Sequence, residues 1–238
     1  MWCYLGIGHS VDFLSLPVGD SPVWWMPRVQ RTGRIDRGHA YPVTLLPLDL
    51  PLALPAAGRL LVAAPLLIDP NFERSVLLLL DHDEEGSLGL ILNRPSVVYV
   101  GSVLPPWEGR TIGTDVLFSG GPVADDSALA LGLLPGPFDG PEPDGFRRVA
   151  GPFGLVDLDC DPDSALADLE AVRIFAGYAG WGADQLADEI AEGAWYVVDG
   201  GPVDVFAPGS VDLWQRVLRR QRGDLAFVAT PSVDPSLN

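Results

Sequence analysis

Between residues 59 and 95, three short apolar runs alternate with polar turns, and this pattern limits the fold more than any other feature of the chain. The runs are RLLVAAP, SVLLLL and SLGLILNRP, and the turns between them are DPNFERS and DHDEEG. Apolar runs of about four to eight residues between turn signals are typical of buried strands. The sequence therefore predicts an antiparallel hairpin over 75–95 beside another buried strand.

Further along, strand and helix patterns alternate irregularly. Strands are predicted at 115–119, 128–134, within 146–159, and at 172–180, 194–198 and 225–230. Asp161 followed by Pro162 predicts the start of a helix that continues to about residue 170. Helical periodicity also predicts helices over 183–192 and 211–221. Because regular βαβ alternation is absent from this pattern, the sequence favours an α+β fold over a doubly wound sheet.

The segment GYAGWG at 177–182 has two interpretations. Its glycines could form a tight turn from a strand into a helix, with Tyr178 and Trp181 packed in the core. Alternatively, backbone N–H groups at the start of that helix could hold an anion. The spacing is neither GxGxxG nor a P-loop, so the sequence favours the structural turn.

Composition excludes several kinds of chemistry. All 15 basic residues are arginine, so a P-loop lysine, a Schiff-base lysine and a lysine that anchors pyridoxal phosphate are impossible. The formal net charge of −17 disfavours direct binding to nucleic acid. Two cysteines without a CxxC pattern and three histidines without HxxxH or HExxH give no zinc motif. We predict neither a cofactor nor a bound metal.

Residues 1–56 differ from the rest of the chain. They contain seven prolines, and four arginines balance four aspartates, so the net charge arises downstream. We predict a disordered leader, or a segment upstream of the true translation start, before one domain at 57–238. The start MWCYLGIGHSVDF lacks a basic region, and Asp49, Arg59 and several prolines interrupt the apolar run at 45–68. These features predict a soluble protein without a membrane span, and the two isolated cysteines indicate a reducing cytoplasm.

Two polar clusters are candidates for chemistry. Residues 81–85 crowd one predicted hairpin tip, where His82 could act as a general base or the carboxylates could bind Mg²⁺ or Ca²⁺; a solvated turn is the favoured interpretation. Asn93-Arg94-Pro95 ends a predicted strand. Asn93 and Arg94 could recognise a carboxylate or phosphate, or Arg94 could be a structural cation paired with a carboxylate at the edge of the core.

Several of these segments together resemble the AlgH/YqgE family of bacterial proteins. The segments are, in order, GRLLVAAPLLIDPNFERSVLLLLDHDEEGSLGLILNRP, LFSGGPV and RIFAGYAGWGADQLADEIAEGAWYVV, and the ending LWQRVLRRQRGDLAFVATPSVDPSLN is similar as well. The resemblance covers about residues 57–238. It implies a single compact cytoplasmic α+β domain with a mixed, barrel-like β-sheet flanked by helices. Members are labelled as transcriptional regulators, and no enzymatic activity or cofactor is established for the family.

The resemblance also suggests candidate site residues. Many of the matching positions, including the glycines, Phe72 and Trp181, are expected to be structural. The polar positions that match the family motifs are the candidates for a shared ligand pocket, and they are Arg74, His82, Asn93, Arg94, Tyr178, Gln185 and Glu189.

These observations favour a regulatory or interaction protein without enzymatic activity, which would act on transcription indirectly through a protein partner. The alternative is a small-molecule or nucleotide-binding protein, and in one version an enzyme. Its pocket would lie near Asn93, Arg94 and the GYAGWG segment and would take a small anionic ligand. Direct DNA binding is the third and least favoured hypothesis.

Overall fold

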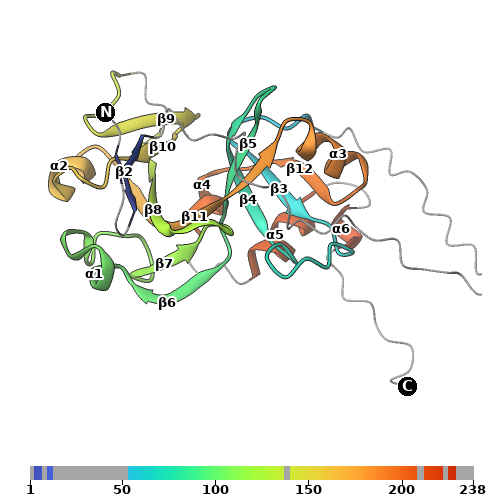
Figure 1. The fold of residues 1–238 in the computed structure, drawn as a ribbon, viewed down its shortest axis with the longest axis horizontal. Helices are drawn as coiled ribbons and strands as arrows, with labels where there is room; N and C mark the ends of the chain where they lie inside the picture. The colour runs from blue at the N-terminus through green and yellow to red at the C-terminus, as the bar shows by residue number, and fades with distance from the viewer. Residues whose placement is uncertain are drawn as a thin grey trace, which may run out of the picture.

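A computed structural model describes residues 3–6, 10–12, 53–136, 140–207, 212–221 and 225–228. Its strands form one curled sheet in which β11 runs between two halves (Figure 1). Nearly all of the strand pairs are antiparallel, and β7 with β11 is a parallel pair. The α+β class predicted from the sequence holds broadly, but the sheet is mostly antiparallel and forms a half-barrel with few, short helices.

One half of the sheet contains β3 (Arg59–Ala63), β4 (Val76–His82), β5 (Gly86–Ile91) and β12 (Trp195–Asp199). They lie in the order β12-β3-β4-β5, and each neighbouring pair is antiparallel. The hairpin predicted over 75–95 is confirmed, because β4 and β5 are adjacent strands joined by a short acidic turn.

The other half contains β6 (Pro95–Tyr99), β7 (Val116–Ser119), β8 (Val123–Leu133), β9 (Phe146–Ala150) and β10 (Phe153–Val156). The chain forms the hairpin β9–β10, and β10 pairs with β8. β8 begins at Val123, five residues before the start of the predicted strand, so the acidic residues Asp125 and Asp126 belong to the strand.

Two short strands from the predicted leader, β1 (Cys3–Gly6) and β2 (Ser10–Asp12), form an antiparallel pair beside β8. Most of the predicted leader, residues 1–2, 7–9 and 13–52, lies outside the described residues. The expected boundary near residue 57 therefore stays a prediction.

Strand β11 (Ala171–Gly182) connects the two halves. Its residues 171–176 pair with β8, and its residues 179–182 pair with β5. The register shifts between these segments at Gly177, whose φ of +69° is favourable only for glycine. The turn from strand into helix predicted for GYAGWG is therefore wrong, because all six residues belong to β11 and the glycines allow this strand to bend. The predicted packing of Tyr178 and Trp181 against the core is confirmed.

The bend in β11 fits directly against the loop before β8. A Cβ atom on Gly177 would lie 2.6 Å from the carbonyl oxygen of Gly121, and one on Gly120 would lie 2.2 Å from the carbonyl oxygen of Gly177. The N–H of Gly120 donates to the carbonyl of Ala176, and its carbonyl accepts the N–H of Ile91, each at 2.8 Å. Backbones from three strands or loops therefore meet where side chains would prevent their approach.

The helices are all short. They are α1 (Val100–Val103), the 3₁₀ turn η2 (Pro105–Trp107), α2 (Pro162–Leu166), α3 (Gln185–Ala191), α4 (Pro202–Val205), α5 (Leu213–Arg219) and α6 (Leu225–Val228). None of the described helices is long and apolar enough to span a membrane.

The sequence predicted the start of α2 correctly but did not predict the helix α6. The predicted cap of α2 is confirmed, because the Asp161 carboxylate accepts the N–H of Ser164 at 3.0 Å and Pro162 is the first helical residue. The strand predicted from residue 225 is wrong, since residues 225–228 are helical and Leu225 is buried. A short apolar run does not distinguish a strand from a helix, and packing beside α5 decides the outcome.

The core consists of three clusters separated by the sheet. The largest lies inside the curl and joins residues of β4, β5, β8 and β11 to α5. A second covers the outer face of the β7–β8 half beneath α1, η2 and α2, and a third covers the outer face of the β3–β4 half beneath α3. Alternate side chains of the central strands therefore pack on opposite faces, as expected for a sheet buried on both sides.

Replacing Gly177 with alanine should strongly destabilise the fold. The new Cβ would require an unfavourable left-handed backbone and would collide with two carbonyl oxygens, so we expect a loss of roughly 2–4 kcal/mol in the free energy of unfolding. Gly180 in the same strand is the matched control, because its Cβ would approach only a Tyr178 ring atom, at 3.7 Å. Urea unfolding should show a change below about 1 kcal/mol for Gly180→Ala; equal losses would contradict this role of Gly177.

Candidate functional site

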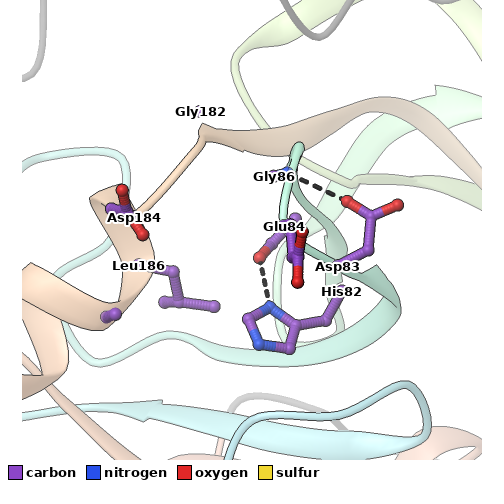
Figure 2. A pocket seen from close by; sticks show the side chains of 9 residues that line it. His82, Asp83, Glu84, Gly86, Gly182, Asp184 and Leu186 are labelled. Carbon is purple, nitrogen blue, oxygen red and sulfur yellow. Dashed lines mark hydrogen bonds between the residues drawn. The ribbon is translucent and has the colours of Figure 1, made fainter.

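The tip of the β4–β5 hairpin and the start of α3 enclose an open pocket of about 360 Å³ (Figure 2). Its lining comes from both elements and from the end of β11, and the residues are His82, Asp83, Glu84, Gly86, Ser87, Gly182, Asp184, Leu186 and Ala187. In Figure 2 the imidazole of His82 and the side chain of Leu186 face each other across this space. The pocket thus combines a polar hairpin with an apolar patch on the helix.

A hydrogen bond joins His82 and Ser87 at the hairpin side of the pocket. The distance from His82 Nδ1 to Ser87 Oγ is 2.7 Å, and Ser87 is buried. An imidazole placed in this way can accept a proton from a hydroxyl group. The sequence reading did not single out Ser87; the hairpin register, which places His82 opposite Ser87, was the signal that could have identified it.

The carboxylates around the pocket have different roles. Asp83 Oδ1 accepts the backbone N–H groups of Glu85 at 2.8 Å and Gly86 at 3.1 Å, so this side chain shapes the turn. Glu84 and Asp184 are exposed, and Asp184 has a left-handed backbone with φ of 60°. None of the lining residues in the described chain is an arginine, so the electrostatic potential of this pocket favours a positively charged group.

The described residues contain no group of three or more His, Cys, Asp and Glu side chains placed to hold a metal ion. The Asp83 hydrogen bonds instead agree with the solvated-turn interpretation of the acidic cluster. Sequence order alone could not separate these two possibilities, because both place carboxylates at a hairpin tip.

Asn93 and Arg94 lie at the opposite end of the hairpin. Asn93 Oδ1 accepts the N–H of Val76 at 3.0 Å, and Asn93 Nδ2 donates to the carbonyl of Arg74 at 2.9 Å. Arg94 Nη2 donates to the carbonyl of Glu73. These contacts connect the loop before β4 to the end of β5, which favours a structural role of the Asn-Arg-Pro motif. The partner of Arg94 in this hydrogen bond is a backbone carbonyl, where the sequence predicted a carboxylate.

Arg74 lies in that loop with a left-handed backbone, φ 53°, and an exposed side chain. Its guanidinium carbon is 6.0 Å from the centre of the Trp214 ring, within the range of a cation–π contact. The interaction links the loop to α5.

Gln185 and Glu189 hold α3 against the sheet. Glu189 Oε2 accepts the indole N–H groups of Trp181 at 2.9 Å and Trp195 at 2.8 Å, and Gln185 Nε2 donates to Glu189 Oε1 at 3.0 Å. The side chain of Gln185 also accepts the N–H of Gly182 at 3.1 Å. Because α3 provides one wall of the pocket, these two residues position that wall.

Tyr178 projects from β11 beside the bend and packs against the main core. Its half-buried position raises the pKa of the phenol above its ordinary value near 10, because burial disfavours the charged form. The seven residues proposed from the family resemblance are therefore distributed among separate places. His82 lines the pocket, Gln185 and Glu189 support its wall, and the other four lie elsewhere.

The exposed strand β6 was not anticipated from the sequence. Val97, Val98 and Tyr99 are 92%, 40% and 68% exposed, although each is a large apolar residue. β6 and β7 form bridges at Pro95–Phe118 and Tyr99–Val116, so two more residues separate these bridges in β6 than in β7. Residues 96–98 therefore form a bulge, and no other described strand lies beside β6.

Arg173 was also missed by the sequence analysis. Its side chain is buried in the core, donates to the carbonyls of Val205 at 2.7 Å and Ala207 at 3.0 Å, and lies 4.3 Å from the centre of the Phe118 ring. Burial lowers the pKa of Arg173 to about 10. These contacts show a structural cation that fixes the end of α4 and the residues directly after it.

Together, the fold and the site define a small α+β half-barrel with a hairpin pocket and an exposed apolar edge strand. Residues 60–226 match the family model described as AlgH-like, and the chain belongs to this family.

Relatives and solved structures agree with this assignment. A UPF0301 protein of Streptomyces coelicolor is 59% identical over 182 residues, covering 76% of this chain and 94% of that protein. One from Thermobifida fusca is 48% identical over 194 residues, covering 78% and 96%. A crystal structure of a Corynebacterium diphtheriae protein gives a TM-score of 0.72 at 37% identity, covering 76% and 95%. The solution structure of AlgH from Pseudomonas aeruginosa gives a TM-score of 0.55 at 26% sequence identity, and the match covers 74% of this chain and 93% of that protein.

Replacing Asn93 with alanine should destabilise the fold without a direct effect on the pocket. The change would remove the partners of two backbone groups, and we expect a loss of about 2–4 kcal/mol in the free energy of unfolding. Arg94→Ala is the matched control, since it removes one contact to a backbone carbonyl from a less buried side chain. Urea unfolding should show the smaller loss for Arg94→Ala, and equal stability of both variants would contradict the assigned role of Asn93.

The raised pKa of Tyr178 predicts a loss of stability in alkaline solution. Above pH about 10 the unfolded state releases the phenolic proton while the folded state retains it, so the folded state binds more protons and stability falls as pH rises. Tyr178→Phe removes this contribution. Unfolding measured at pH 9 and pH 11 should show a smaller decrease for the variant, whereas identical decreases would contradict the buried phenol as a cause.

Proposed function

We propose that this chain is an interaction protein without catalytic activity, which acts indirectly, for example on transcription, by binding another polypeptide in the cytoplasm. The observation that carries the proposal is the exposed β6 bulge with Val97, Val98 and Tyr99. Contiguous exposed apolar side chains on a folded domain are typical of protein-binding surfaces.

The energetics favour coverage of this strand by another polypeptide. Burying one exposed valine side chain contributes roughly 1.5–3 kcal/mol, and neighbouring valines with an aromatic ring give a small cluster of apolar anchors. Among the described residues β6 pairs only with β7, so a partner segment in extended conformation could also form backbone hydrogen bonds along its other edge.

The charge of the chain supports a protein partner over nucleic acid. A formal net charge of −17 repels the phosphate backbone, which is the main source of affinity for DNA-binding proteins. The family name AlgH, carried by the Pseudomonas aeruginosa structure, states no activity and adds no catalytic role.

A photoreactive amino acid at position 97 tests the proposed function. We expect specific cross-linking in cells to a polypeptide, which mass spectrometry would identify and reconstitution with purified components would confirm. Position 203 is the matched control, because Val203 is also an exposed valine, 75% accessible, on α4. Equal, unspecific labelling from both positions would overturn the assignment of β6 as the binding surface.

The alternative function is binding of a small molecule in the hairpin pocket. It is favoured by the His82–Ser87 pair, the apolar side chain of Leu186 and the contact of the pocket with the last glycine of GYAGWG. An anionic ligand at Asn93 and Arg94 stays an untested prediction, and the carboxylate-rich pocket suits a cationic ligand instead.

Native mass spectrometry of the gently purified protein tests this alternative. It should detect a bound small molecule that His82→Ala loses and Arg94→Ala retains. A ligand retained by His82→Ala and lost by Arg94→Ala would exclude the hairpin pocket as its site.

A further inference from the structure

We infer that the polypeptide covering β6 is a second copy of this chain, packed across a two-fold axis with the two β6 strands antiparallel. This inference rests on the proposed function, since it names the partner of the same surface. Three features of β6 carry it: the apolar bulge, the absence of charge along the segment, and the opposite charges at its two ends.

The segment from Pro95 to Trp107 contains no Asp, Glu, Arg or His, in a chain with a formal net charge of −17. Two copies of such an acidic protein repel each other over most of their surfaces. An uncharged apolar segment is where they can approach with little repulsion. A strongly basic partner would find no carboxylate on this segment to recognise.

Opposite charges lie at the two ends of the uncharged segment. Arg94 directly precedes β6. Glu108 is exposed, and its side chain lies over Gly101 just beyond the other end, because a Cβ on Gly101 would be 2.8 Å from the Glu108 carboxyl carbon. Arg94 uses one guanidinium nitrogen on the Glu73 carbonyl, and a guanidinium carries five N–H donors.

Across a two-fold axis, the charges at the two ends of the segment in one copy match the opposite charges in the other copy. When two β6 strands run antiparallel, the Arg94 end of each copy faces the Glu108 end of the other, and this contact occurs twice. Val97, near the middle of β6, then lies close to its own symmetry mate. An unlike partner would have to reproduce an uncharged apolar segment with the reverse order of flanking charges, which a second copy supplies automatically.

Sedimentation velocity of the full chain over a range of concentrations, from micromolar upward, tests the inference. Wild type should show a reversible monomer–dimer equilibrium. Val97→Lys should raise the dissociation constant by about 100-fold, because it places two ammonium groups near the axis. Val203→Lys, the matched control on α4, should leave the dissociation constant unchanged. A wild-type protein that stays monomeric throughout, or equal effects of the two lysines, would overturn the inference.

Charge reversal gives a second test, because a purely structural role of Arg94 would not allow a second substitution at Glu108 to restore the dimer. Arg94→Glu and Glu108→Arg should each weaken the dimer about tenfold or more, and the double variant should restore it, since every facing pair would again be opposite. Circular dichroism would verify that each variant is folded. A folded double variant no tighter than the singles would overturn the antiparallel arrangement.

The outcomes separate this inference from the proposed function. A monomeric protein whose position 97 still cross-links to one defined unlike polypeptide would contradict the dimer and support the interaction protein. If the protein dimerises but Val97→Lys does not weaken the dimer, the interface does not include β6, and this result would contradict the inference. A monomer without specific cross-linking at position 97 would contradict both proposals.

Discussion

The approach of three glycine backbones at the bend in β11 is the constraint on which the rest of the structure depends. Gly177 bends the strand, and Gly120 and Gly121 bring the loop before β8 into direct contact with that bend. Because β11 pairs with β5 beyond the bend and with β7 and β8 before it, this contact makes two half-sheets into one curled sheet. The curl encloses the largest apolar cluster, so hydrophobic burial and backbone geometry support each other.

The hairpin pocket and the exposed strand β6 both depend on elements that are connected to β11. β11 ends at Gly182, next to the hairpin tip. The indole N–H of Trp181 donates a hydrogen bond to Glu189 on α3. The wall of the pocket is therefore positioned by the strand itself. On the other side, β6 follows β5 and is attached through β7, which is itself paired with β11. The exposed apolar bulge is thus attached to the central sheet through β7, where the proposed binding surface lies.

Sequence reasoning succeeded where the signals were local. The hairpin at 75–95, the Asp161 cap and the helices near 185 and 213 all depend on neighbouring residues. It failed for GYAGWG and for residues 225–228, because distant packing partners decide those conformations. The site was only partly accessible for the same reason: Asn93 and Arg94 bond to backbone groups 17 and 21 residues away. Family resemblance suggested these residues as a group, yet a resemblance does not show which of them share a pocket.

Native-state hydrogen exchange of the full chain tests most directly whether the glycine contact unites the two half-sheets. The amides of β4 in one half and those of β8 in the other should exchange through a common opening, with free energies that agree and that shift together in mild denaturant. Protection that differs clearly between β4 and β8, with one half opening while the other remains closed, would contradict a single cooperative unit built around the bend in β11.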